Sequence, residues 1–83
     1  MSKRFLIYGR SSCEFCCLSC DFLFASGENY QFFDFEEDRP FLEEAKGFYD
    51  FQTVPIILEN DLSTGKISFI GGYSDLLEWT RDD

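Results

Sequence analysis

The sequence is short of basic residues, has no histidine, and has no apolar run approaching the roughly 18–20 residues of a membrane span. Seven basic residues against sixteen acidic ones give a formal net charge of −9. Phosphate-backbone binding depends on clustered Lys and Arg, so neither nucleic acid nor a membrane is expected as a partner. The N-terminal stretch MSKRFLIYGR holds too few apolar residues for an export signal, which favours a cytoplasmic location.

A chain of 83 residues is short, but 45% of it is hydrophobic and eleven residues are Phe. That composition supports a packed core and disfavours disorder. We expect residues 1–83 to form one domain, and a monomer, because the sequence shows no linker, no repeat and no sign of an obligate interface.

Apolar runs and chain breakers predict seven elements in the order β-α-β-α-β-β-α. Ser11 or Ser12 is expected to cap the first helix. Asp38, Pro40, Glu43 and Glu44 give the acidic, proline-containing start of the second helix, and a turn-rich hairpin, NDLSTG, is expected between the last two strands. The predicted strands are 4–9, 30–35, 53–59 and 66–70, and the predicted helices are 11–26, 38–49 and 74–82.

Aromatic and branched residues of the strands are expected to fill the two buried faces of the sheet. This set comprises Phe5, Leu6, Ile7, Phe32, Phe33, Phe35, Ile56, Ile57 and Phe69. Trp79 is predicted to pack the last helix onto the core. The acidic segment DFEEDRPFLEE is read as a solvated helix entry, with docking of a partner through its carboxylates as the alternative.

All four cysteines lie within residues 13–20, and Cys13 and Cys16 fall where a strand gives way to a helix. Unpaired N–H groups and the helix dipole stabilise an anion at such a place, and Arg10 adds a positive charge nearby. A C-x-x-C spacing lets the second thiol resolve a mixed disulfide formed at the first. The pattern therefore predicts a dithiol redox couple.

Cys17 and Cys20 leave three interpretations open. They are read first as helix-packing residues, second as sites of regulatory oxidation, and third as members of a zinc or iron–sulfur site with Cys13 and Cys16. One continuous helix cannot easily wrap four thiolates around an ion, and the chain has no histidine to complete a zinc site, so no metal is expected.

Three segments resemble the glutaredoxin family in order and spacing: IYGRSSCEFC (7–16), TVP (53–55) and IGGYSDL (70–76). The resemblance covers nearly the whole chain. It implies an α/β thioredoxin fold, with a four-stranded mixed sheet flanked by helices. The short chain is also similar to the small glutaredoxins of bacteriophages, which would place it in a host cytoplasm.

The resemblance also implies roles. Cys13 would be the nucleophile and Cys16 the resolving thiol, while Pro55 would be a cis-proline holding the backbone of Val54 opposite them. The remaining residues would bind glutathione or substrate: Arg10, Phe15, Thr53, Val54, Gly71, Gly72, Tyr73, Ser74 and Asp75.

The activity implied is glutathione-dependent reduction of protein disulfides or mixed glutathione disulfides. Glutathione would be the reductant, with no tightly bound cofactor, and ribonucleotide reductase would be one expected protein partner. The alternatives are an electron carrier that thioredoxin reductase feeds, or a metal or iron–sulfur carrier that uses the cysteines.

The sequence departs from the family pattern at four positions. Glu14 and Phe15 replace the common Pro-Tyr between the cysteines, Asp50 stands where the family often has Gly, and Leu42 stands where some members have a polar glutathione contact. Asp tolerates a left-handed conformation less easily than Gly.

We expect Glu14→Pro to raise the reduction potential of the Cys13–Cys16 couple. Glu14 places a carboxylate beside the nucleophile, which disfavours the thiolate and makes the couple more reducing. Equilibration with glutathione redox buffers measures the potential, and an unchanged value in the variant would contradict this interpretation.

Overall fold

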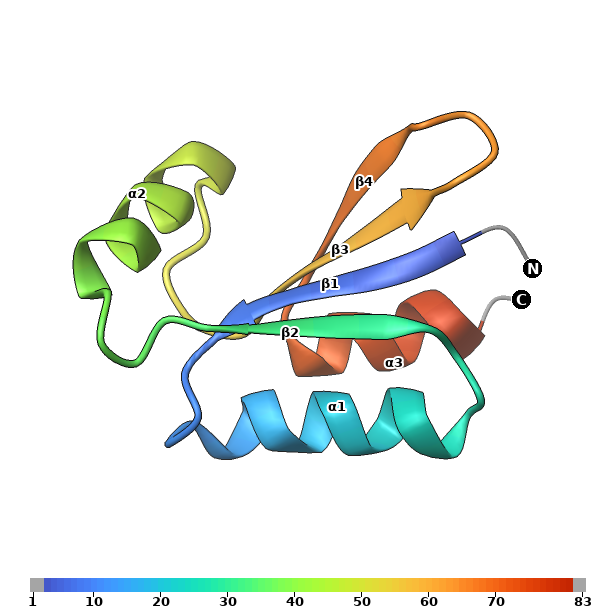
Figure 1. Ribbon diagram of the computed structural model, residues 1–83, viewed down its shortest axis with the longest axis horizontal. Helices are drawn as coiled ribbons and strands as arrows, with labels where there is room; N and C mark the ends of the chain where they lie inside the picture. The colour runs from blue at the N-terminus through green and yellow to red at the C-terminus, as the bar shows by residue number, and fades with distance from the viewer. Residues whose placement is uncertain (1–2, 82–83) are drawn as a thin grey trace.

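A computed structural model describes residues 3–81 of the chain, and its elements follow the predicted order (Figure 1). The elements are β1 (Lys3–Gly9), α1 (Glu14–Ala25), β2 (Tyr30–Asp34), α2 (Arg39–Tyr49), β3 (Ile56–Asp61), β4 (Ile67–Gly71) and α3 (Tyr73–Arg81). Residue 82, which the sequence places in the last helix, lies outside the described residues.

The four strands form one mixed sheet in the order β2-β1-β3-β4. β1 pairs with β2 in parallel, and β3 pairs with both β1 and β4 in antiparallel fashion. This is the topology of the thioredoxin fold, as the sequence predicts. The parallel pair has a direct consequence for the site, because the chain leaves β1 and β2 at the same edge of the sheet.

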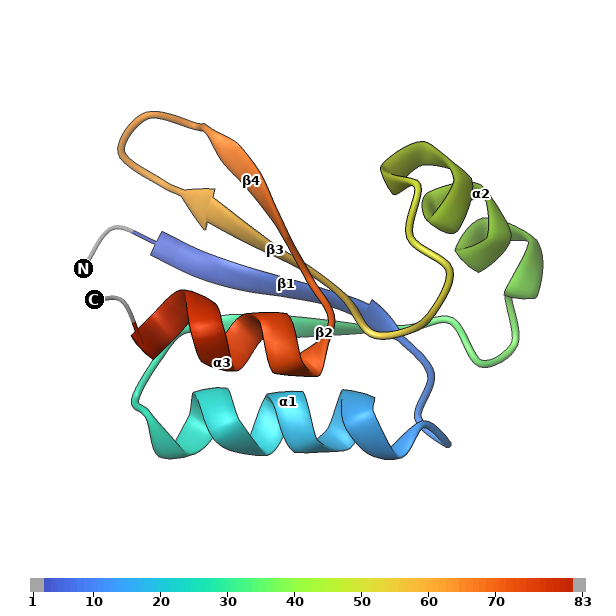
Figure 2. The ribbon, with the colours of Figure 1, turned by 180° about the vertical axis from the view of Figure 1, so that it is seen from behind.

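The helices separate to the two sides of the sheet. Figures 1 and 2 show α1 and α3 lying side by side against one face, whereas α2 stands apart at the end where β1 and β2 finish. The sheet, α1 and α3 together supply a cluster of buried core residues: Phe5, Ile7, Leu23, Ile57, Ile70 and Leu76.

The other face carries an aromatic cluster. The ring of Tyr8 makes edge contacts with Phe33, Phe35 and Phe41, and Phe41 stacks on Phe35 with ring centroids 4.3 Å apart. Aromatic pairs in these geometries add stability beyond the area they bury. They attach α2 to the sheet.

Two predicted starts are wrong by three residues, and the other predicted bounds within residues 3–81 lie within two residues of the observed ones. The first helix begins at Glu14 with Cys13 as its N-cap and without a side-chain cap, so neither Ser11 nor Ser12 caps it. The third strand begins at Ile56, because residues 53–55 form a bend that precedes the strand. Asp38 caps α2, its carboxylate accepting from the N–H of Phe41.

Several burial predictions also need correction. Phe69 is 38% exposed, and Phe32, Phe33 and Phe35 are only partly buried. Trp79 is not a core residue either, because it is 36% exposed and its Nε1 donates to the carboxylate of Glu59 at 3.1 Å. An indole N–H needs an acceptor, and Glu59 of β3 provides one for Trp79 at the surface.

Position 50 takes the conformation that favours glycine. Asp50 ends α2 with φ 53° and ψ 48°, and its N–H donates to the carbonyl of Gly47. Asp is among the residues that visit this left-handed region, so the substitution is accommodated without a change in how the helix ends.

No helix among residues 3–81 is both long enough and apolar enough to span a bilayer.

Leu23→Ala is expected to lower the free energy of unfolding by about 3 kcal/mol, because Leu23 is fully buried and the deletion leaves a cavity. Its neighbour gives the matched control: Phe24 is 76% exposed, so Phe24→Ala should change stability by less than about 0.5 kcal/mol. Urea unfolding followed by circular dichroism measures both. Equal losses in the two variants would show that α1 does not pack as described.

Candidate active site

Cys13 lies at the point where the loop after β1 becomes α1. Its backbone is extended, with φ −87° and ψ 122°, and its carbonyl accepts the first helical hydrogen bond from Cys17 at 3.2 Å. The N–H of Cys13 donates to the carbonyl of Arg10. A partly exposed thiol therefore sits beside the N–H groups of the first helical turn.

The loop before β3 faces this thiol. The Sγ of Cys13 donates to the carbonyl oxygen of Val54 at 3.8 Å, and the Val54–Pro55 peptide is cis, as the family resemblance implies. Residues more than forty positions apart are thus brought into contact by the fold. A group bound at the backbone of Val54 would lie next to the Cys13 sulfur.

Cys16 is fully buried one helical turn behind Cys13. Burial raises the pKa of the Cys16 thiol to about 12, and the neighbouring Cys13 and Cys17 sulfurs act in the same direction, against the lowering effect of the Arg10 backbone. Gly9 makes room for the thiol, because a Cβ at position 9 would collide with the Sγ of Cys16. At neutral pH Cys16 is therefore a neutral thiol.

A groove of about 290 Å³ runs along the loop before β3. Its walls come from the first turn of α1, from the loop and from the first turn of α3. The lining residues are Phe15, Phe51, Thr53, Val54, Pro55, Gly72, Tyr73, Ser74 and Asp75. Eight of these nine are predicted site residues, and the ninth, Phe51, is an aromatic that the sequence reasoning missed.

Phe15 and Tyr73 form the aromatic rim of this groove. Phe15 is 53% exposed, and the two ring centroids are 5.9 Å apart. Phe15 therefore lies at the rim of the groove. An exposed aromatic pair beside a thiol offers apolar area to a substrate.

Asp75 has a structural contact that the sequence did not predict. Its Oδ2 accepts the N–H of Gly72 at 2.9 Å, as an acidic residue at the third helical position commonly does. Gly71 has φ +125°, and a Cβ there would collide with the Asp75 carboxylate. The double glycine thus lets α3 begin close against the groove.

Arg10 is outside the groove lining and already has an anionic partner. Its Nη2 lies 3.4 Å from the Oε2 of Glu36, in the loop after β2. Oε1 of the same carboxylate accepts from the N–H of Ser12 at 3.1 Å and from its hydroxyl at 2.8 Å. The Ser12 hydroxyl, then its N–H and then Arg10 hold the pKa of Glu36 below its usual value.

Asp34 fixes the same loop. One oxygen, Oδ1, accepts from the N–H of Glu36 and from the N–H of Ser11, both at 3.0 Å. These hydrogen bonds, that from Glu36 above all, lower the pKa of Asp34. Two carboxylates from the β2–α2 connection therefore hold the residues that immediately precede Cys13, and their segment is not simply the solvated helix entry that the sequence suggests.

Cys17 and Cys20 lie on the flank of α1 away from the groove. The exposed Cys17 thiol donates to the carbonyl of Ser11 at 3.7 Å, and burial raises the pKa of the half-buried Cys20 thiol. All four cysteines are thiols. Within residues 3–81, no three His, Cys, Asp or Glu side chains are placed to hold a metal ion together, so the metal alternative gains no support from this arrangement.

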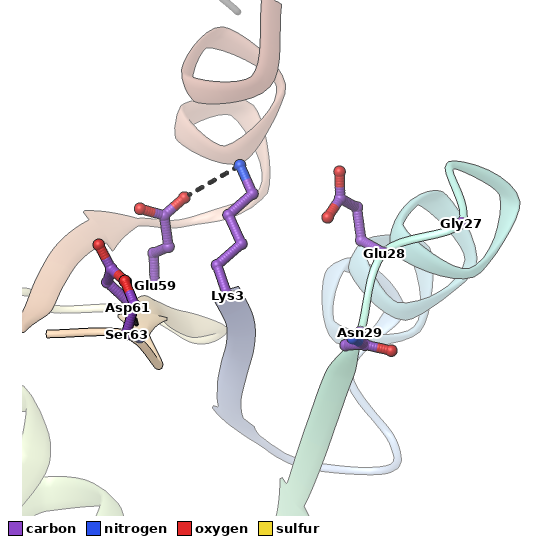
Figure 3. Close-up of a pocket in the computed structure, with 7 residues that line it drawn as sticks. All are labelled: Lys3, Gly27, Glu28, Asn29, Glu59, Asp61 and Ser63. Atoms are coloured by element: carbon purple, nitrogen blue, oxygen red, sulfur yellow. Dashed lines mark hydrogen bonds and ion pairs between the residues drawn. The ribbon is translucent and has the colours of Figure 1, made fainter. Parts of the chain in front are cut away.

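A larger hollow, of about 560 Å³, lies near the start of β1 (Figure 3). Figure 3 shows it between the β1 and β3 side chains and the loop after α1, with an ion pair of 3.5 Å between Lys3 and Glu59 on one wall. Neither this hollow nor the smaller groove is lined by a cysteine, but Val54, which lines the smaller groove, accepts a hydrogen bond from the Cys13 thiol. Size alone does not make the larger hollow the reactive site, because the redox chemistry requires thiols.

Comparison with known proteins agrees with the predicted resemblance. A family model described as Glutaredoxin matches residues 5–61, more than half of the chain. The crystal structure of glutaredoxin 1 from Francisella tularensis complexed with cacodylate has a TM-score of 0.68 and 21% sequence identity, over 96% of this chain and 94% of that chain. That likeness shows a shared fold. No match was found among curated protein sequences.

The stability of the reduced protein should fall at alkaline pH because of Cys16. A pKa raised from 9.0 to about 12 contributes stability that is complete below pH 9 and is lost as the pH rises toward 12. The loss should be at most about 1.4 kcal/mol per pH unit. Urea unfolding between pH 8.5 and 11 should therefore show a steeper decline for the wild type than for Cys16→Ala.

The same comparison separates Cys16 from Tyr49. Burial also raises the pKa of Tyr49, which adds a decline of the same sign to both proteins. Parallel curves for the wild type and Cys16→Ala would mean that the Cys16 thiol is not held neutral by burial.

Proposed function

The chain belongs to the glutaredoxin family, and from this premise we propose that it is a glutathione-dependent dithiol–disulfide oxidoreductase whose nucleophile is Cys13. Membership supports thiol–disulfide oxidoreductase activity in general. The observation that carries the specific proposal is the asymmetry of the two thiols: Cys13 is partly exposed at a helix N-cap, and Cys16 is buried one turn behind it.

The reductive half of the reaction needs only the two thiols. The Cys13 thiolate attacks one sulfur of a substrate disulfide, forms a mixed disulfide, and releases the other substrate sulfur as a thiolate that takes up a proton. Cys16 then attacks the Cys13 sulfur, gives up its own proton, and displaces the second substrate thiol. The substrate gains two electrons, and the protein ends with a Cys13–Cys16 disulfide.

Two glutathione molecules would restore the dithiol. The first attacks the Cys13 sulfur and frees Cys16, and the second attacks the glutathione sulfur of that mixed disulfide. The products are oxidised glutathione and the Cys13 thiolate, so two electrons return to the protein. Once released, Cys16 takes up a proton, because burial raises the pKa of its thiol to about 12.

The groove next to Cys13 is proposed to hold the substrate backbone. An extended segment would pair with the backbone of Val54 beside the cis-proline, in a local form of strand addition. Glutathione would use the same groove, with Thr53 along its length and Ser74 and Asp75 at its γ-glutamyl end. Gly71 and Gly72 leave room for the close approach.

Two features of the site favour an electron donor other than glutathione. Arg10, which would meet a glutathione carboxylate, is already paired with Glu36, and Leu42 is buried and apolar. Both features weaken a glutathione site and favour thioredoxin reductase as an alternative source of electrons. Cytoplasmic disulfide proteins are the proposed substrates under either donor, ribonucleotide reductase among them.

A coupled assay with glutathione reductase and a small mixed disulfide tests the proposal. Cys13→Ser should reduce turnover by at least about 100-fold, because the nucleophile is lost. Cys16→Ser should retain turnover through the mixed disulfide with glutathione but lose reduction of protein disulfides. Cys17→Ser and Cys20→Ser are the matched controls in the same helix and should stay within about twofold of the wild type.

The assay is repeated with thioredoxin reductase in place of glutathione and its reductase. Turnover with thioredoxin reductase alone would replace glutathione as the donor and leave Cys13 as the nucleophile. Full activity in Cys13→Ser, or no disulfide reduction with either donor, would refute the oxidoreductase proposal.

A further inference from the structure

The Glu36 carboxylate is built into the loop that carries the nucleophile. It binds Arg10 and makes two hydrogen bonds to Ser12, the residue immediately before Cys13. Asp34 in turn receives the N–H of Glu36. Two of the three contacts of the Glu36 carboxylate are made to a single residue, so the position of this negative charge relative to Cys13 is fixed by the backbone and not by a mobile side chain alone.

Arg10 needs this partner. Its side chain is only 31% exposed, and within residues 3–81 its buried Nε has no hydrogen-bond acceptor. A half-buried guanidinium is stabilised by a nearby anion, and Glu36 supplies one. The single cation next to the nucleophile is therefore neutralised from inside the protein.

The segments that bound Cys13 are otherwise acidic. Residues 10–16, 34–37, 51–55 and 71–75 contain one basic residue, Arg10, and five acidic ones: Glu14, Asp34, Glu36, Glu37 and Asp75. One positive charge against five negative ones gives these four segments together a net charge of −4. An approaching anion meets repulsion, and an approaching cation meets attraction.

We propose that Glu36 sets the charge preference of the Cys13 site, selecting disulfides that carry a cation or no charge beside the sulfur over those that carry a carboxylate. This inference rests on the proposed disulfide exchange at Cys13. Glu36 is a positioning and specificity-determining residue, because it acts through Arg10 and Ser12 and takes no part in bond exchange. A carboxylate substrate would have to displace Glu36 from Arg10 before it could use that guanidinium.

The consequence for protein substrates is a chemical class. Disulfides flanked by Lys or Arg are favoured, and disulfides flanked by Asp or Glu are disfavoured. The overall charge of −9 acts in the same direction at long range, whereas Glu36 acts at the reacting sulfur. Added salt screens the long-range attraction and, in part, the local effect of Glu36 as well. Substitution of Glu36 is therefore needed to distinguish the two effects.

The test uses three symmetrical disulfides of similar length: cystamine (cationic), bis(2-hydroxyethyl) disulfide (neutral) and 3,3′-dithiodipropionate (anionic). The reduced protein is mixed with each at pH 7.5 and low salt, without glutathione, and the second-order rate is measured by acid quench and chromatography. Each turnover converts one disulfide to two thiols and the protein dithiol to its disulfide.

The variants are Glu36→Gln and, as the matched control, Glu37→Gln. Both remove one negative charge from adjacent positions, but within residues 3–81 the exposed Glu37 carboxylate makes no hydrogen bond or ion pair. The wild type should reduce cystamine faster than dithiodipropionate. Glu36→Gln should lower that ratio about tenfold, and Glu37→Gln should keep it within about twofold.

The Arg10→Gln/Glu36→Gln double variant gives a readout that loop disorder would not produce. Freed from Glu36, Arg10 should attract the anionic disulfide, so removal of Arg10 in that background should restore the preference for the cation. In the wild type, raising NaCl from 10 to 500 mM should lower the ratio of the cystamine rate to the dithiodipropionate rate. This measurement uses no variant, so it applies even if a variant folds poorly.

The outcomes separate the two proposals. A cation-to-anion ratio near one in the wild type at low salt, or equal effects of Glu36→Gln and Glu37→Gln, would overturn the assignment to Glu36 while leaving the oxidoreductase intact. Failure to reduce even the neutral disulfide would instead refute the disulfide exchange on which the assignment rests.

Discussion

The parallel pairing of β1 with β2 is the constraint on which the site depends. Gly9 and Asp34 are the last registered pair of these strands, and the N–H of Phe35 still donates to the carbonyl of Gly9 at 2.8 Å. Both chains therefore leave the sheet together. The loop that bears the nucleophile runs beside the carboxylates of the next connection because of that register, and no contact within either loop alone would hold it there.

Element order was predictable because each strand is a short apolar run closed by a chain breaker. The errors fall where distant contacts override local preference. Ser11 and Ser12 look like helix caps, but their N–H groups find Asp34 and Glu36 more than twenty residues away. The TVP segment has the β-branched residues of a strand, yet it forms the bend that faces Cys13.

The groove was largely predictable and the charges around it were not. The family motifs name eight of its nine lining residues, since a motif records what the backbone must do at each position. They do not record which residue pairs with Arg10. The signal that could have revealed this pairing is topological. Acidic residues at the end of β2 lie at the same sheet edge as the loop after β1, which carries the cysteines, because the two strands are parallel.

The absence of a side chain at Gly9 defines what can follow it seven positions later. A methyl group there would occupy the space of the Cys16 sulfur. The second thiol can therefore be buried in this place only because position 9 has no side chain. In this chain a larger residue at position 9 would have to displace either the Cys16 sulfur or the strand end itself, so the burial of the second thiol depends on a residue outside the C-x-x-C motif.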